Sequence, residues 1–211
     1  MTSLAGVLTV ALALGACGGG GAGDGEAGGG GAAPGPVCEG PVGPCDTVTC
    51  SYPEAVGVHV ASCTPIDFAT NPPTSGPHYP QWARFESYTQ AIARGFWVHS
   101  MEHGAVTLAY DCPGGCAGDL GALEAVVAAQ PQDPACAAPV VTRIVLTPDP
   151  DLDAPIAAAA WGFALTAQCV DAPLVEAFVA AHYARAPEDE CGGGIDPTDP
   201  VNAIPADCGQ P

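Results

Sequence analysis

The sequence predicts one small α+β domain in which two helices pack on a mixed or antiparallel sheet and disulfides staple the fold. Two observations carry this prediction. Short apolar stretches typical of β-strands are interrupted by two segments with helical periodicity, in the order β-β-β-α-β-β-α. The chain also contains 11 cysteines, a high number that is typical of exported, disulfide-bonded proteins. With 211 residues, it is long enough for one domain with a hydrophobic core.

The first segment has the features of an export signal. Residues 4–14 form an apolar run that is too short to span a bilayer, because a membrane-spanning helix needs about 20 residues. Residues 14–17 (LGAC) resemble the lipobox of bacterial lipoproteins, in which the cysteine is lipidated and becomes the new N-terminus. We therefore expect a signal peptide over residues 1–16 and a lipid anchor on Cys17 that attaches the protein to a membrane. The alternative is a cleavable secretory signal with an unrelated cysteine.

The glycine-rich segment that follows predicts a tether. Residues 17–36, which begin with the expected lipidated cysteine, contain nothing that can form a core. We expect the α+β domain over residues 37–190 and a cysteine-stapled acidic tail over residues 191–211. Gly18, rather than an aspartate, follows the lipobox cysteine. General lipoprotein sorting then predicts the cell envelope, at the periplasmic face of the outer membrane if the organism is Gram-negative.

Five stretches have the apolar character of strands. We expect these strands over residues 56–60, 96–98, 106–110, 140–147 and 161–165. The second and third lie on either side of a break that contains two histidines. Residues 71–80 (NPPTSGPHYP) cannot form a regular element, because four prolines remove four backbone donors.

Two segments predict helices that pack on the sheet. Residues 119–130 place Leu120, Leu123 and Val126 on one stripe. Residues 172–185 carry a longer apolar stripe, and Asp171 is the expected N-cap. That stripe consists of Leu174, Val175, Phe178, Val179, His182 and Tyr183. We expect His182 to be packed or to lie at its edge.

The cysteines left after lipidation are even in number. The positions that remain are Cys38, Cys45, Cys50, Cys63, Cys112, Cys116, Cys136, Cys169, Cys191 and Cys208. Up to five disulfides follow, and the sequence does not fix all pairings. Cys112 with Cys116 is the expected local bridge, and Cys191 with Cys208 would close the tail. Zinc bound by cysteines is disfavoured, because no pair has the C-x2-C spacing of structural zinc sites.

The charge balance excludes nucleic acid as a partner. The chain has 4 Lys+Arg against 23 Asp+Glu, a formal net charge of −19. Affinity for nucleic acid comes from basic side chains that neutralise phosphates, and few are available here. The acidic run at residues 149–153 (DPDLD) begins like a calcium loop. It lacks the turn glycine and the late glutamate, so we interpret it as surface acids.

Four of the five histidines lie within residues 59–103. The last two, His99 and His103, fit H-x-x-E-H, the inverted zinc-protease motif. That motif requires a helix, so that both side chains reach one ion. Because the flanking residues have strand character, and residues i and i+4 of a strand are about 13 Å apart, a metalloprotease is a weak match.

Two histidine-bearing strings resemble a known family. Residues 71–80 and residues 98–106 (VHSMEHGAV) are similar to the two signatures of a bacterial family called domain of unknown function 3105. Further similar segments follow in the same order as far as residue 188, and His59 stands where the family often has a histidine. The resemblance covers roughly residues 54–188. It supplies a motif rather than a reaction, because the function of the family is unknown.

The histidine cluster predicts a transition-metal site. We expect at least three of four histidines to bind one Cu or Zn ion, since imidazole suits both metals. The candidates are His59, His78, His99 and His103. Met101 and Glu102 are possible accessory ligands. Met101 would favour Cu(I), but core packing is its alternative, and Glu102 would instead orient a histidine.

Three classes of function stay open. The first, which we prefer, is an exported metal-binding lipoprotein of the cell envelope. The second is a metal-dependent hydrolase-like enzyme, with three histidine ligands, a bound water and Glu102 as general base. The third is a disulfide-stapled structural or interaction module whose histidines only brace the fold. Whether the protein is an enzyme is therefore left open, with the balance against it, since no substrate pocket is identifiable.

Overall fold

The computed structural model describes residues 34–209. The signal peptide expected over residues 1–16, Cys17 and almost all of the expected tether lie outside these residues. The described part contains twelve elements. They are β1 (Val37–Val42), β2 (Thr47–Ser51), β3 (Val58–His59), β4 (Pro77–His78), α1 (Arg94–Glu102), β5 (Val106–Tyr110), α2 (Ala117–Ala129), β6 (Ile144–Pro148), β7 (Ile156–Ala160), β8 (Phe163–Ala167), α3 (Ala172–His182) and the 3₁₀ turn η1 (Pro200–Asn202).

The main sheet is mixed, one of the two forms that the sequence predicts. Its six strands lie in the order β1-β2-β8-β7-β5-β6. The neighbours β5 and β6 are parallel, whereas the other four pairs are antiparallel. The helix α2 lies between β5 and β6 in sequence and supplies the long crossover that parallel strands need. The expected α+β class, single small domain and disulfide staples are confirmed.

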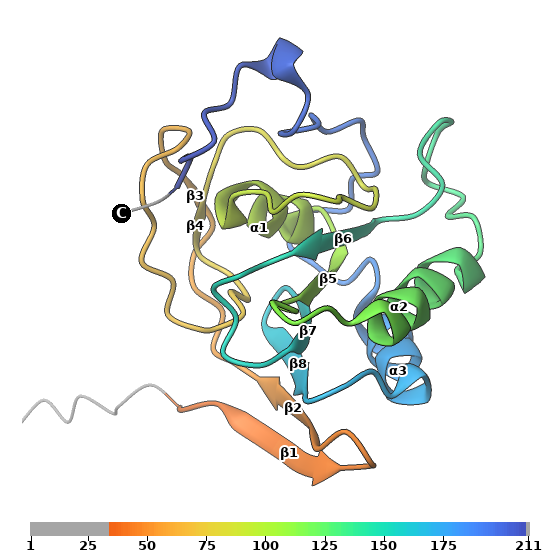
Figure 1. Cartoon of the computed structure of the whole chain (residues 1–211). Coiled ribbons are helices and arrows are strands. Elements are labelled where there is room, and N and C mark those ends of the chain that lie inside the picture. Colours follow the sequence, from red (N-terminus) through yellow and green to blue (C-terminus); the bar gives the residue numbers. More distant parts are fainter. Residues whose placement is uncertain (1–33, 210–211) are drawn as a thin grey trace, which may run out of the picture. The chain divides into compact units, whose positions relative to one another are not determined.

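Both faces of the sheet are covered. The helices α2 and α3 pack on one face, against the even-numbered residues of β5 and β6 and the apolar side of β8 (Figure 1). The helix α1 lies on the opposite side, where its apolar residues pack with Val145 and Ala159. Because strand side chains alternate between faces, Ile144 and Val145 belong to different cores.

The prediction of a strand over residues 96–98 is wrong, because these residues lie in α1. Phe96, Trp97 and Val98 are all fully buried, and burial extends around the helix from Gly95 to Met101. A short helix that is buried on all sides has no amphipathic stripe. Its bulky residues then resemble a buried strand in sequence. This helix positions the histidine motif.

Five disulfides staple the domain, and three of them join segments more than 50 residues apart in sequence. The described residues contain the pairs Cys38–Cys50, Cys45–Cys169, Cys63–Cys208, Cys112–Cys116 and Cys136–Cys191. The predicted Cys112–Cys116 bridge is confirmed, whereas the predicted Cys191–Cys208 bridge is wrong. The segment after Cys191 is not a self-closed loop, because Ile195 forms a β-bridge with Ala83 on the body of the domain. These bridges indicate an oxidising environment, extracellular or periplasmic.

The predicted helices occur with shifted ends. The predicted 119–130 helix is α2, and the predicted 172–185 helix is α3. Asp171 is the N-cap residue of α3, although its side chain makes no capping hydrogen bond. His182 is half-buried and stacks on Phe163, with ring centroids 4.0 Å apart. Within residues 34–209, no helix has the length and apolarity needed to cross a bilayer.

Candidate metal site

A two-stranded parallel ladder brings the first two histidines together. In this ladder, His59 of β3 is the direct partner of His78 of β4, and Val60 N–H donates to the His78 carbonyl over 2.8 Å. Paired strands are about 4.8 Å apart. The two imidazole centroids are accordingly 5.0 Å apart. His59 is exposed and His78 is fully buried, so this pair reaches from the surface inward.

The helix α1 supplies the third histidine. His99 is 3 % exposed, and its ring centroid lies 4.8 Å from that of His59 and 4.6 Å from that of His78. The three rings therefore surround one point. The helix is fixed to β4 by Tyr79 N–H, which donates to the Gly95 carbonyl over 3.1 Å.

Backbone carbonyls determine which ring nitrogens face this point. The Nδ1 atom of His78 is 2.9 Å from the Gly76 carbonyl, and Nδ1 of His99 is 2.6 Å from the Tyr79 carbonyl. A carbonyl only accepts, so each Nδ1 carries the proton and donates it. Each neutral ring then has a bare lone pair on Nε2. Metal-binding histidines are commonly oriented in this way.

Burial keeps these two rings neutral. Desolvation lowers the pKa of His78, and it lowers the pKa of His99 to about 3. The carbonyl hydrogen bonds act in the opposite direction and are outweighed in both cases. At neutral pH both Nε2 atoms are thus available as ligands.

Glu102 adds a carboxylate to the three imidazoles. Its Oε2 atom lies 3.0 Å from Nε2 of His78. One ligand atom from each of His59, His78, His99 and Glu102 lies within 4.8 Å of the other three. Glu102 follows His99 by three residues, so the two side chains share a face of α1. The group offers three nitrogens and one oxygen, a donor set that zinc and copper accept.

Gly57 leaves room for this carboxylate. A Cβ atom at this position would overlap Oε1 of Glu102 and would lie 3.3 Å from Cε1 of His78. The residue adjoins β3, directly before the strand that carries His59. The requirement for glycine here is therefore one of space, set by the close approach of Glu102.

His103 lies beside the site rather than within the same ligand group. Its Nε2 atom is 3.2 Å from Nε2 of His99 and 3.1 Å from Oε2 of Glu188. The structure groups His103 with Glu188 and Glu190. Trp82 covers this histidine, with ring centroids 4.5 Å apart. Of the four predicted ligands, three converge and the fourth touches one of them.

Met101 points away from the histidines. A residue two positions along a helix is rotated by about 200°, so Met101 lies nearly opposite His99 on α1. Its side chain is fully buried in the hydrophobic core. The core-packing alternative stated for Met101 is the one that the structure shows.

A buried ion network supports the C-terminal end of α1. Arg143 is 2 % exposed, and its Nη1 donates to the His103 carbonyl over 3.1 Å and to Asp189. Its Nε donates to Asp133 over 3.0 Å, and the Tyr183 hydroxyl donates to the same carboxylate. The network ties His103 to the segment that carries Glu188.

Sequence reasoning missed the contributions of Gly57, Trp82 and Glu188. Glu188 belongs to the last segment that resembles the family, which was the available signal for it. The carbonyls of Gly76 and Tyr79 are backbone groups, so no residue type indicates their role. Their position follows only from the three-dimensional path of residues 76–79.

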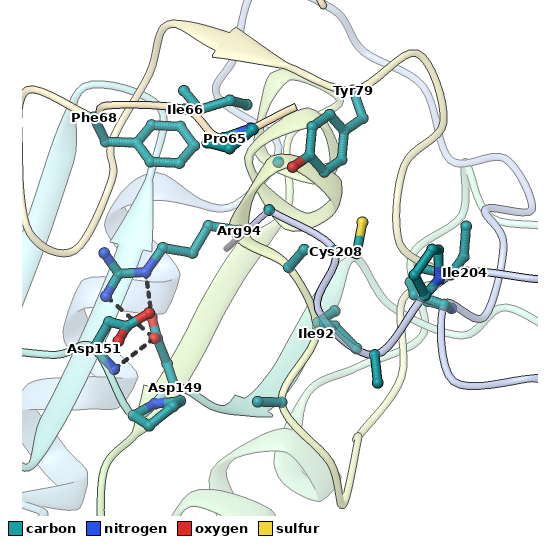
Figure 2. A pocket seen from close by; sticks show the side chains of 18 of the residues that line it. Pro65, Ile66, Phe68, Tyr79, Ile92, Arg94, Asp149, Asp151, Ile204 and Cys208 are labelled. Carbon is teal, nitrogen blue, oxygen red and sulfur yellow. Dashed lines mark hydrogen bonds and ion pairs between the residues drawn. The ribbon is translucent and has the colours of Figure 1, made fainter. Parts of the chain in front are cut away.

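A separate cavity lies at the other end of α1. It has a volume of about 820 Å³, and none of the five histidines lines it. Figure 2 shows Arg94 pointing at Asp149, and Nε of Arg94 donates to this carboxylate over 2.9 Å. Asp149 is 4 % exposed, so the interpretation of residues 149–153 as surface acids is wrong at this position. Burial raises the pKa of Asp149.

The fold and the histidine cluster define a small, disulfide-bonded α+β domain with a candidate metal site. A family described as "Protein of unknown function (DUF3105)" matches residues 59–193. The match spans more than half of the chain, and the chain belongs to this family. No curated protein and no solved structure matches the chain significantly.

Proposed function

We propose that this domain binds one divalent transition-metal ion, Zn²⁺ or Cu²⁺, through His59, His78, His99 and Glu102. One observation carries the proposal. The protons on Nδ1 of His78 and His99 are taken by backbone carbonyls, which leaves Nε2 of each ring free to bind, and one ligand atom of each residue lies within 4.8 Å of the other and of the Glu102 carboxylate. Two bare imidazole nitrogens and a carboxylate in one small volume repel each other unless a donor or a cation lies between them.

The donor set favours a divalent ion over Cu(I). Imidazole and carboxylate suit Zn²⁺ and Cu²⁺, whereas Cu(I) prefers thiolate and thioether ligands. Within residues 34–209 the one thioether is that of Met101, which lies in the core on the far side of α1. The described cysteines are paired in disulfides and offer no thiolate.

The cellular role that we propose is that of an exported metal-binding lipoprotein. The lipobox-like residues 14–17 would provide a lipid on Cys17, and the glycine-rich residues up to 36 would hold the domain away from the membrane. Gly18 after the cysteine supports the periplasmic face of the outer membrane if the organism is Gram-negative. The disulfides of the domain are compatible with this placement.

Metal analysis of the oxidised protein tests the site. We expect stoichiometric Zn²⁺ or Cu²⁺ in the wild type. His78→Asn and His99→Asn should each weaken binding by more than the ~10–100-fold that loss of an orienting contact costs. His182→Asn is the matched control, since that ring stacks on Phe163 away from the site. Absence of stoichiometric metal, or unchanged affinity in both site variants, would overturn the proposal.

A metal-dependent hydrolase is the second candidate. It is favoured by one observation that differs from the predicted strand: residues His99–Glu102 of the H-x-x-E-H segment are helical, and His103 is the C-cap residue. His59 is exposed, so solvent reaches one side of the group. An enzyme of this type needs an exchangeable water on the metal, with Glu102 as base rather than ligand. Water proton relaxation on the Cu²⁺-loaded protein distinguishes this arrangement from a closed four-ligand site. The disulfides also fit the structural-module alternative, which predicts no metal binding.

A further inference from the structure

We propose that His103, Glu188 and Glu190 form a second divalent-cation site, which makes the histidine cluster dinuclear. One ligand atom from each of these three residues lies within 4.8 Å of the other two. The group shares no residue with the first ligand set. The inference therefore goes beyond the proposed function, although the two sites adjoin.

His103 is the buried anchor of this second group. It is 2 % exposed, and its Nδ1 atom has no hydrogen-bond partner. Its Nε2 faces two acceptors: the bare Nε2 of His99 at 3.2 Å and Oε2 of Glu188 at 3.1 Å. The Nε2 atom carries at most one proton, so both acceptors cannot receive a full hydrogen bond from it. A cation held by the Nε2 lone pair and the glutamates would replace both contacts, and the ring proton would then lie on Nδ1.

The acidic side of the group is anchored by the backbone. Glu188 N–H donates to the Glu102 carbonyl over 3.0 Å, at the last residue of α1. The Cys136–Cys191 disulfide fixes the chain directly after Glu190. Both glutamates are exposed, so a hydrated ion can reach them, while their backbone is held against the helix that carries His103.

The local charge matches two divalent ions. Glu102, Glu188 and Glu190 contribute three negative charges. The buried Arg143 is outnumbered by its two carboxylate partners, Asp133 and Asp189, which adds one more. The carboxylates and Arg143 thus sum to four negative charges, and two divalent cations would neutralise them. The Nε2 atoms of His99 and His103, at 3.2 Å, would each face a different ion, as in two-metal sites with ions about 3.5–4 Å apart.

Metal titration of the full, oxidised chain tests the second site. With Zn²⁺, we expect two equivalents in the wild type and one in the Glu188→Gln/Glu190→Gln double variant. Glu124→Gln/Glu176→Gln is the matched control, because these glutamates are exposed on α2 and α3, and it should bind two. With Cu²⁺, the doubly loaded wild type should lose electron paramagnetic resonance intensity through coupling of the two ions. The double variant should show the full signal of one isolated ion.

The outcomes separate this inference from the proposed function. A wild type that binds one ion, lost in His78→Asn and retained in the double variant, would overturn the second site and leave the first standing. A second equivalent that survives the double variant would also overturn it. A protein whose single ion is lost in the double variant but retained in His78→Asn would uphold this site and contradict the first.

Discussion

Nε2 of the buried His78 lies 3.0 Å from Oε2 of Glu102, although His78 already donates its ring proton to the Gly76 carbonyl. Two acceptors thus face each other, and the buried Nε2 of His78 has no donor. The contact disfavours the metal-free fold and favours a bound cation. Removing the contact should therefore stabilise the metal-free protein and weaken its affinity for metal.

Glu102→Gln should separate these two effects. The amide can donate to Nε2 of His78, so the free energy of unfolding of the metal-free protein should rise by about 1 kcal/mol. The affinity for Zn²⁺ should fall at least ~10-fold, since an amide oxygen is a weaker ligand than a carboxylate. Denaturant unfolding with a chelator and metal titration measure the two quantities. Glu176→Gln is the control, and a variant that loses both stability and affinity would contradict this account.

Gly57→Ala should weaken metal binding without unfolding the domain. The added Cβ overlaps Oε1 of Glu102, so the carboxylate must move, and we expect a loss of affinity of ~10–100-fold. Gly121→Ala is the matched control, because a Cβ there meets nothing within 4 Å. Gly121 lies within α2, so this control should gain up to about 1 kcal/mol. Equal metal affinity in both variants would show that metal binding does not depend on the present position of the Glu102 carboxylate.

The free energy of unfolding of the metal-free protein should decrease as the pH falls below the ordinary histidine pKa. Burial lowers the pKa of His99 from 6.5 to about 3, so the unfolded chain binds this proton first. The contribution of His99 to the free energy of unfolding is fully present above about pH 6.5 and is lost progressively toward pH 3. The expected slope is about 1.4 kcal/mol per pH unit for one proton. Unfolding of wild type and His99→Asn between pH 7 and 5 measures it, and an unchanged slope in the variant would refute the assignment.

Arg143→Ala should be strongly destabilising. The side chain is 2 % exposed and pairs with Asp133, which is also buried, so its removal leaves an uncompensated carboxylate. Breaking such a pair costs about 3–5 kcal/mol. Arg84→Ala is the control, since the half-buried Arg84–Glu86 pair is largely accessible to solvent and should contribute less than ~1 kcal/mol. If chemical denaturation shows similar losses of unfolding free energy in the two variants, burial does not decide the contribution of Arg143.

The Cys63–Cys208 bridge should stabilise more than the Cys112–Cys116 bridge. The first spans 145 residues and the second 4, and cross-links restrict the unfolded chain more when the loop is longer. The other bridges shorten the effective loop, so we expect about 3–4 kcal/mol for the first pair and about 2 or less for the second. Double Cys→Ser variants of each pair, compared by denaturant unfolding, test this order.

The sequence was most informative where one face of an element is exposed. The helices α2 and α3 bury one stripe each, and their residues show this directly. The fully buried α1 has no such pattern, and for this reason the sequence predicts a strand over residues 96–98. The strand β7 contains four alanines, which lack the β-branched or aromatic character that indicates strands.

The candidate site was predictable in its residue types and not in its arrangement. The count and spacing of His59, His78 and His99 indicated a cluster. That His103 belongs to a different group depends on Glu188, which is 85 residues further along the chain and reaches the site through a backbone contact to Glu102. Pairings of this kind, like those of Cys191 and Cys208, are decided by tertiary packing.

The position of Cys63, four residues after His59, has a consequence for the order of maturation. Its bridge to Cys208 ties the loop behind β3, the strand that carries His59, to the last described residues. Under the proposed function, a chain that is still reduced lacks this tie and should bind metal more weakly than the oxidised chain. Oxidation of this cysteine pair would then precede metal binding.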